Sequence, residues 1–303
     1  MLTHLKLKLG LLLGILLINI IPGFSQRNFD DVTIKVTHVS GTVYMLEGAG
    51  GNIGVSVGDD GILIVDDQFA PLADKIRAAL ASIAQTPLKF ILNTHWHGDH
   101  TGGNPEFGPE APIIAHTNVR KRLQQEHQRG NRVIPPMKKE GLPVITFDES
   151  LSIHFNGEEI KAIHSPHAHT DGDLIIYFTG SNVVHMGDIY FSGRFPFIDR
   201  ASGGTVQGVI AAVKSVLQHI PENAKIIPGH GPLSSRSDLT AYLQMLTETL
   251  AYVKQQVNAG KSLAEIQEAG LPQRWEAWNW RFISTQRWIE TLYEELSTAD
   301  KNS

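Results

Sequence analysis

The stretch Thr94–Gly103 constrains the fold and the chemistry of this chain more than any other part of the sequence. Four potential metal ligands fall within six residues of it: His95, His97, Asp99 and His100. They follow the apolar run 90–92, which is typical of a buried strand. The first three recur with period two, so an extended or turning chain presents them on one side, whereas a helix would place His97 opposite the other two. Glycines within and after the cluster allow tight bends that free His100 to point elsewhere. A metal site explains this density of ligands better than a solvated polar loop does.

Composition sets the broad class of protein. The chain has 303 residues, 42% of them hydrophobic and 19% charged, as in an ordinary globular protein with a substantial core. Its formal net charge of −5 gives no electrostatic footprint for nucleic acid, so no nucleic-acid partner is predicted. It contains 14 histidines and no cysteine, which excludes disulfides and thiolate metal ligands.

The N-terminal stretch predicts a secretory signal peptide over residues 1–25. Lys6 and Lys8 precede an apolar run, Leu9–Ile21, that is followed by Pro22 and small residues near Ser25. The run is shorter than the roughly 20 residues of a membrane-spanning helix, so no stable span is expected after cleavage. Removal of residues 1–25 takes away two lysines and no acidic residue, which moves the net charge from −5 to −7. We therefore expect a periplasmic or secreted protein.

The remaining chain, 26–303, predicts one domain of strands and helices. Strands are expected over residues 31–66, 88–92, 113–115 and 144–163, and again over 174–178, 182–185 and 225–227. Helices are expected over Pro71–Ile83, Asn118–Gln128, Gly203–His219, Asp238–Asn258, 262–269 and 282–296. No linker rich in proline or serine divides the two runs of strands, so one domain built on two sheets fits better than two domains. The helices from about residue 237 onward form a C-terminal extension.

Ligand-type residues follow four separate apolar strands. They are His95 after 91–92, His169 after Ile163, Asp188 after 183–184 and His230 after 226–227. Each of the last three is weak evidence alone, because Gly-Asp and Pro-Gly-His-Gly occur in ordinary turns. Strand ends that meet at one edge of a scaffold would bring them together, and their joint occurrence with the first cluster makes the signal strong.

This succession of motifs resembles the metallo-β-lactamase superfamily. The matching pieces, in the order of the family, are Thr94–His100, His169–Asp173, Met186–Asp188 and Pro228–Gly231. The resemblance covers roughly residues 40–235. It implies an α/β (α+β) fold, a four-layer αβ/βα sandwich in which two mixed β-sheets are flanked by helices, with a dinuclear metal site at one edge of the sheets.

The resemblance also implies a role for each ligand. His95, His97 and His169 would hold one metal, and Asp99, His100 and His230 the other, with Asp188 bridging the two. Imidazole and carboxylate ligands suit Zn²⁺, so two zinc ions per chain are expected, with iron or manganese as alternatives. Such a pair, about 3.5–4 Å apart, makes a hydroxide available at neutral pH and polarises a carbonyl group. Asp99 and Asp188 would be the catalytic carboxylates, and Asp99 would relay a proton.

Four further residues stay open at this point. Asp66, Asp67 or Asp173 would accept a hydrogen bond from a ligand histidine or cap a turn. His167 competes with His169 as a ligand, and the Thr-Asp-Gly-Asp sequence that follows His169 favours His169.

The expected function is that of an exported metallo-hydrolase of a small carbonyl compound, namely a β-lactam, a lactone or another ester. Absence of cysteine excludes the β-lactamase subclasses whose second metal is held by cysteine, and the aspartate-bridged pattern resembles glyoxalase II and lactonases. The export signal argues against a cytosolic glutathione thioester as substrate. Two alternatives are an iron-dependent oxidoreductase similar to persulfide dioxygenases and an inactive binding module; the complete ligand set argues against both.

Three segments carry paired hypotheses. The glycine-rich tip Gly48–Gly51 is either a flap over the site or a surface turn. Phe191–Phe197 either lines a substrate pocket, with Arg194 at a substrate carboxylate, or is an ordinary loop. The tryptophan-rich segment Trp275–Trp280 packs on the sheet or forms a homo-oligomer contact.

Overall fold

The computed structural model describes residues 28–129 and 132–299, and the predicted signal peptide lies outside them. The chain divides into two units, Met1–Asp31 and Val32–Ser303. The first is described only from Asn28, whose side-chain oxygen accepts a hydrogen bond from the Asp30 amide. The second unit is described over residues 32–129 and 132–299.

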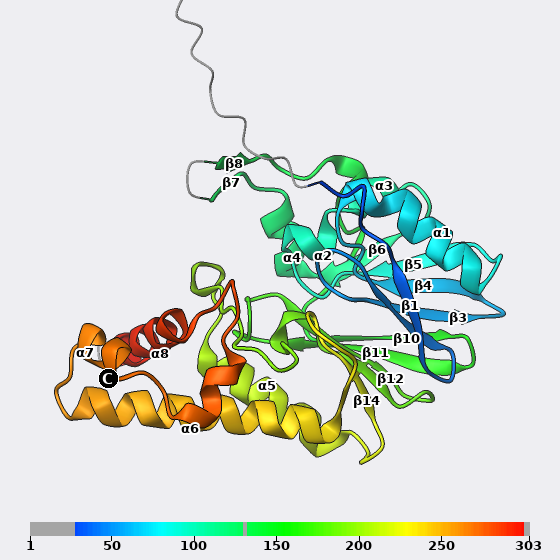
Figure 1. The fold of residues 1–303 in the computed structure, drawn as a ribbon. Helices are drawn as coiled ribbons and strands as arrows, with labels where there is room; N and C mark the ends of the chain where they lie inside the picture. Colours follow the sequence, from blue (N-terminus) through cyan, green and yellow to red (C-terminus); the bar gives the residue numbers. More distant parts are fainter. Residues whose placement is uncertain (1–27, 130–131, 300–303) are drawn as a thin grey trace, which may run out of the picture. The chain divides into compact units, whose positions relative to one another are not determined.

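Two mixed β-sheets form the centre of this unit (Figure 1). The first has the order β1 (Lys35–Ser40), β2 (Val43–Glu47), β3 (Ile53–Gly58), β4 (Gly61–Val65), β5 (Leu88–Leu92), β6 (Ile113–His116) and β9 (Ile145–Phe147). It is antiparallel from β1 to β4 and parallel from β4 to β9. The parallel part brings the carboxyl ends of β4, β5 and β6 to one edge.

The second sheet has the order β10 (Ser150–Phe155), β11 (Glu158–Ser165), β12 (Asp173–Phe178), β13 (Val183–His185), β14 (Lys225–Ile227) and β15 (Ser234–Ser235). Only the β13–β14 pair is parallel. A separate hairpin consists of β7 (His127–Arg129) and β8 (Arg132–Ile134).

The alternation of side chains along each strand explains why the sheets stack. In β12, Ile176 packs into a core shared with Leu63 and Leu92 of the first sheet, whereas its neighbour Ile175 packs against helices on the opposite face. Because successive side chains of a strand point to opposite faces, a strand that is apolar at both positions has to be covered on both sides. Each large aliphatic side chain that is fully buried in these layers contributes about 1.5–3 kcal/mol of hydrophobic stabilisation.

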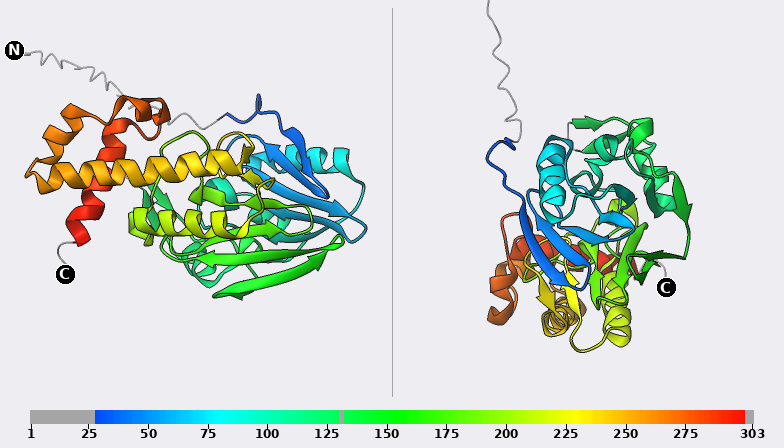
Figure 2. Two further views of the ribbon diagram at one scale, coloured as in Figure 1. Left: turned by 90° about the horizontal axis from the view of Figure 1, so that it is seen from below. Right: turned by 90° about the vertical axis from the view of Figure 1, so that its right-hand side faces the viewer.

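Helices supply the outer layers (Figure 2). They are α1 (Ala73–Ile83), α2 (Gly98–Thr101), α3 (Asn104–Phe107), α4 (Thr117–Leu123), α5 (Val206–His219), α6 (Arg236–Asn258), α7 (Leu263–Ala269) and α8 (Thr285–Ala299). Short 3₁₀ turns are η1 (Ala70–Leu72), η2 (Lys139–Gly141), η3 (Gly187–Ile189), η4 (Arg200–Ser202) and η5 (Gln273–Trp278). Helix α5 covers the second sheet with its apolar stripe, and α6 and α8 belong to the same core. The sandwich of two mixed sheets flanked by helices is the predicted fold class.

Local signals place the ends of these helices. Thr205 caps α5 by accepting a hydrogen bond from the Gly208 amide, and Ser235 and Asp238 form a capping box at the start of α6. The predicted helix Asn118–Gln128 is too long, because α4 ends at Leu123 and residues from His127 pair with β8 instead. The imidazole of His127 bonds to the carbonyl oxygen of Arg122 and so terminates that helix. In the described part of the chain, no helix is long and apolar enough to cross a membrane.

Candidate metal centre

The structure brings the seven predicted ligand side chains to one edge of the two sheets. They come from four loops: the segment after β5, the turn between β11 and β12, the 3₁₀ turn after β13 and the segment after β14. The parallel pairings β4–β5–β6 and β13–β14 direct these loops to the same edge. The side chains form two groups, one of His95, His97, His169 and Asp188 and the other of Asp99, His100 and His230.

In the first group, three imidazole nitrogens converge. His97 Nδ1 lies 3.1 Å from His95 Nε2 and 3.0 Å from His169 Nε2. Asp188 Oδ2 completes the group, 3.8 Å from His95 Nε2 and 3.6 Å from His169 Nε2. Three nitrogens and one oxygen that surround a common point form a donor set suited to a four-coordinate divalent cation.

The second group surrounds the other oxygen of Asp188. Asp188 Oδ1 lies 3.1 Å from His100 Nε2 and 3.4 Å from His230 Nε2, and His230 Nε2 lies 3.4 Å from Asp99 Oδ2. One carboxylate therefore faces both groups with different oxygens, which is the geometry that a bridging ligand requires.

The chain around Asp99 is not extended as the period-two argument assumed. Residues 98–101 form the short helix α2, for which His97 is the N-cap. The helical turn sends Asp99 and His100 to the second group, while His95 and His97 stay with the first. The spacing of the motif thus places ligand-type side chains in two groups rather than one.

Burial and charge set the protonation of these groups. Burial lowers the pKa of His95 and lowers that of His169 to about 4, so both imidazoles are neutral and have free lone pairs at neutral pH. Burial raises the pKa of Asp188, but the neighbouring His230 and His100 outweigh it and hold that pKa well below its usual range. Burial likewise opposes protonation of His230, yet the neighbouring Asp188 carboxylate raises the pKa of His230 to about 9. A cation that binds here has to displace protons from the second group.

Two buried atoms between the groups, His100 Nε2 and Asp188 Oδ1, lie 3.1 Å apart, but neither has hydrogen-bond geometry with the other or with another described residue. Buried polar atoms are almost always paired, and an unpaired one costs about 1–3 kcal/mol. Both atoms point toward the same space as the other ligand atoms of their group. The residues present therefore fit a pair of divalent cations.

Asp66 supports the second group from the end of β4. Its carboxylate is fully buried and accepts hydrogen bonds from the Thr94 amide and hydroxyl, each at 2.7 Å. Its Oδ2 also lies 2.7 Å from His100 Nδ1, so this oxygen accepts a hydrogen bond from the ring N–H and leaves His100 Nε2 free to bind a cation. Asp66 has a φ of 66°, a strained backbone conformation for a residue other than glycine.

Asp199 supports the first group, and sequence reasoning did not find it. Its Oδ2 lies 2.9 Å from His97 Nε2 and accepts a hydrogen bond from the Ser202 hydroxyl at 2.6 Å. Because Asp199 Oδ2 accepts a hydrogen bond at His97 Nε2, the ring proton is on Nε2 and Nδ1 is free to bind a cation. Asp199 lies 30 residues after His169 in a loop without a motif, so no local signal could have indicated it.

The other open residues have structural partners. Asp67 accepts a hydrogen bond from the Gly103 amide, and Asp173 caps the turn at Thr170 through its amide and hydroxyl. Both carboxylates therefore stabilise the loops that contain the candidate ligands, and neither accepts a hydrogen bond from a ligand ring. His167 lies outside the two groups and bonds to the Gly203 carbonyl oxygen, which leaves the predicted choice of His169 in place.

The glycine-rich tip of the β2–β3 hairpin is attached to the centre rather than free. The Gly51 amide donates to the Asp99 carbonyl oxygen at 3.0 Å, and the Gln68 side chain donates to the Gly51 carbonyl oxygen at 2.7 Å. A Cβ atom at Gly51 would meet the His100 ring, so only glycine allows this close approach.

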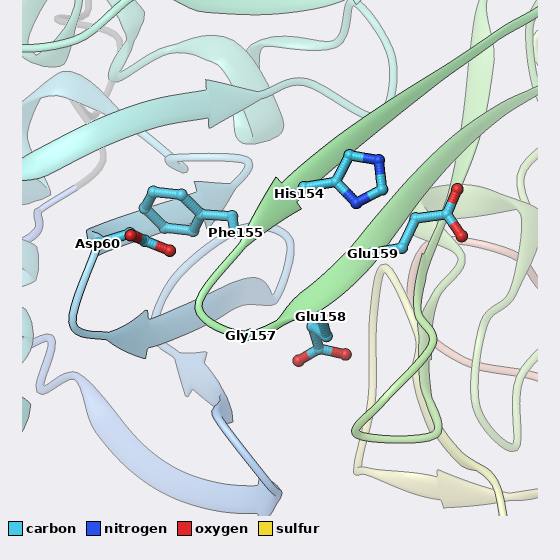
Figure 3. A pocket seen from close by; sticks show the side chains of 6 residues that line it. All are labelled: Asp60, His154, Phe155, Gly157, Glu158 and Glu159. Atoms are coloured by element: carbon cyan, nitrogen blue, oxygen red, sulfur yellow. The ribbon is translucent and has the colours of Figure 1, made fainter.

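A surface pocket of about 340 Å³ lies elsewhere, at the turns of β3–β4 and β10–β11 (Figure 3). Its lining consists of Asp60, His154, Phe155, Gly157, Glu158 and Glu159, none of which is a predicted ligand. Glu158 bonds to Thr42 and Ser181, and Glu159 bonds to Ser152. These acidic groups hold the hairpins together, and the pocket offers no catalytic arrangement.

The model of the metallo-beta-lactamase superfamily matches residues 39–252. The chain belongs to this superfamily. It is 30% identical over 139 residues to the 2,4-dinitroanisole O-demethylase subunit alpha of Nocardioides sp. (strain JS1661), across 45% of this chain and 40% of that protein. It is 31% identical over 152 residues to a hydroxyacylglutathione hydrolase of Prochlorococcus marinus (strain NATL1A), across 47% of this chain and 51% of that enzyme. The chain thus spans about half or less of the length of these two relatives.

The superfamily fold also appears among solved structures. A metallo-beta-lactamase from Pontibacter korlensis superposes with a TM-score of 0.60 at 16% identity, over 71% of this chain and 99% of that one. At this identity the likeness shows the shared fold alone. The matched residues 39–252 contain all seven candidate ligands.

Proposed function

We propose that this superfamily member is a metal-dependent hydrolase that cleaves a small carbonyl substrate, such as a β-lactam, a lactone or another ester. The observation that carries the proposal is Asp188, whose two oxygens face two complete groups of imidazole and carboxylate ligands. His95, His97 and His169 would hold one cation, and Asp99, His100 and His230 the other. Zinc suits these donors, and two ions per chain are expected.

When bound, such a pair of cations lowers the pKa of a water molecule toward neutrality and polarises a carbonyl oxygen. The chain supplies the remaining requirements. Asp66 and Asp199 orient the ligand rings through His100 Nδ1 and His97 Nε2. These two carboxylates also determine which nitrogen of each ring carries the proton.

Asp99 is the candidate for proton transfer. Its side chain is 34% exposed, against 6% or less for His95, His100, His169 and Asp188. Burial opposes ionisation of Asp99, but the hydrogen bond with His230 lowers the pKa of its carboxyl group, so the group is ionised at neutral pH. A carboxylate at the solvent side can accept a proton from the attacking water and return one to the leaving group.

We also propose export, on the strength of the positive start and apolar run of residues 1–25. Residue 26 should then be near the first residue of the mature protein. N-terminal sequencing of protein from the periplasm or medium checks this; a mature chain that starts at Met1 in the cytoplasm would contradict it.

The test of hydrolysis is a panel of β-lactams (nitrocefin included), lactones, thioesters and phosphodiesters, assayed on one zinc-loaded sample. We expect turnover of at least one carbonyl substrate, and its loss with chelator and with His97→Ala. His154→Ala is the matched control, because this histidine lies in the surface pocket and should not affect turnover. One iron and no zinc per chain would favour the oxidoreductase alternative, and no turnover by the fully loaded protein would contradict the proposal.

A further inference from the structure

Four aromatic side chains form a wall beside the metal centre. We call them the aromatic wall: Phe191, Phe197, Trp280 and Phe282. The Phe191 ring stacks on the ring of His230 at 5.2 Å between centroids, and Phe197 lies 6.0 Å from His97. Trp280 lies 6.1 Å from Phe191, and Phe282 lies 5.5 Å from Phe197, so the wall continues outward from the ligand rings.

The wall borders the side of the centre that is open to solvent. The side chains of His97 and His230 are 17% and 18% exposed, whereas those of His95, His100 and His169 are fully buried. Phe191 and Phe197 contact the two exposed imidazoles. Phe191 is buried at 2% exposure behind the other rings, so Phe197, Trp280 and Phe282 are the members of the wall that a molecule beside the centre can contact.

Hydrogen bonds attach the C-terminal half of the wall to the loop that follows Asp188. The Phe195 amide donates to the Trp278 carbonyl oxygen, and Trp280 Nε1 donates to the Phe195 carbonyl oxygen, both at 2.9 Å. Trp280 and Phe282 are thus held in place although they lie about 50 residues beyond His230.

Two arginines stack on the wall. The guanidinium carbon of Arg194 lies 5.1 Å from the centre of the Trp280 ring. That of Arg287 lies 4.6 Å from the Phe282 ring and 5.6 Å from the Phe197 ring. Within residues 28–129 and 132–299, neither arginine forms an ion pair with a carboxylate. Arg287 is exposed, and among the described residues its guanidinium group donates one hydrogen bond, to the Phe282 carbonyl oxygen.

We infer that the substrate has an aromatic or extended apolar group that packs on the aromatic wall and an anionic group that Arg194 and Arg287 bind. This rests on the proposed function for the cleaved bond and adds the chemical class of the molecule that carries it. Planar apolar groups pack on aromatic rings, and a guanidinium group without a carboxylate partner provides unused N–H donors for a carboxylate or sulfonate. The preferred substrate is then an anionic, apolar ester, lactone or β-lactam.

The test is a binding measurement that needs no turnover. The probe is 2-naphthalenesulfonate, an aromatic anion that is a poor metal ligand, titrated into zinc-loaded full-length protein by tryptophan fluorescence. Its neutral counterpart is 2-naphthalenemethanol. We expect R194Q/R287Q to raise the Kd of the sulfonate by about fivefold or more, with the Kd of the alcohol unchanged, since an exposed charge pair has a modest effect on affinity. F282A should weaken both probes.

The matched control is R281Q, which removes one positive charge from an exposed arginine of the same segment, for which no stacking on a ring of the described residues is found. Its effect on the sulfonate should stay within about twofold, because an exposed charge that does not contact the bound anion is screened by salt. An equal effect of R281Q and R194Q/R287Q, or wild-type protein that binds neither probe, would overturn the inference.

Zinc content and turnover on the same samples separate this inference from the proposed function. Turnover by zinc-loaded protein with unchanged sulfonate affinity in R194Q/R287Q refutes the role of the arginines and leaves the hydrolase. The expected probe binding without turnover of any substrate refutes the hydrolase and leaves the anion-binding wall.

Discussion

Asp199→Asn should weaken the binding of metal by the first group of ligands while the protein stays folded. Asp199 Oδ2 faces His97 Nε2 and the Ser202 hydroxyl, and its Oδ1 accepts a hydrogen bond from the Ser202 amide at 3.2 Å. An asparagine amide satisfies only one side of this arrangement. In either orientation its N–H group meets another N–H donor, that of His97 or that of Ser202.

The expected loss is about 10- to 100-fold in metal affinity, the usual effect of removing the acceptor behind a ligand histidine, which corresponds to about 1.4–2.7 kcal/mol. The assay is competition for zinc with a chromophoric chelator at fixed pH. Asp171→Asn is the matched control: it removes a carboxylate that pairs with Arg122 and contacts no ligand ring. Thermal unfolding of the metal-free proteins establishes that both variants fold.

Zinc affinity of Asp199→Asn within about twofold of wild type would refute this reasoning, because the predicted effect is at least tenfold. An equal loss in Asp171→Asn would attribute the effect to the charge of the region rather than to the contact with His97.

Three further predictions follow from the structure. Gly51→Ala should displace the His100 ring and reduce zinc binding toward one ion per chain, and overpacking should lower the free energy of unfolding by about 1–3 kcal/mol. Metal analysis checks the zinc content against the control Gly98→Ala, where an added Cβ meets nothing within 4 Å. Chelation should lower the free energy of unfolding by about 4 kcal/mol for each site that was filled at 1,000 times its Kd, and excess zinc should restore it in a melting experiment. Burial and the stacked ring of His164 lower the pKa of His116 in the folded protein below 6.5, its value in the unfolded chain. Between these two pKa values the unfolded chain binds more protons than the folded protein, so the free energy of unfolding rises with pH over that interval. Urea unfolding with chelator present, from about pH 5 to pH 8, should show this slope in wild type and a flatter one in His116→Gln.

The sequence was enough to predict the sandwich of two mixed sheets and the residues that the structure brings together. Both rest on local patterns, namely apolar strands that end in ligand-type residues, and on a resemblance carried by four short motifs. Period-two reasoning was wrong for Asp99, because the helical turn α2 begins at Gly98 and redirects it. The end of α4 was wrong for a similar reason, since pairing of β7 with β8 outweighs helix propensity beyond Leu123.

Contacts between distant segments could not be predicted. Asp199 reaches His97 across 102 positions of sequence, and Trp280 reaches Phe191 across 89. Nothing in the residues around Asp199 or Trp280 indicates their partners, because the packing of the loop after Asp188 against the C-terminal segment decides them. Asp66 was one of three candidate supports, and only the three-dimensional fold separates it from Asp67 and Asp173.

The central claim is that seven side chains hold two cations that share Asp188. Anomalous scattering at the zinc edge from crystals of the zinc-loaded protein tests it most directly. We expect two peaks, one among His95, His97 and His169 and the other among Asp99, His100 and His230, each in contact with Asp188. A single peak, no peak, or zinc bound away from Asp188 would contradict it.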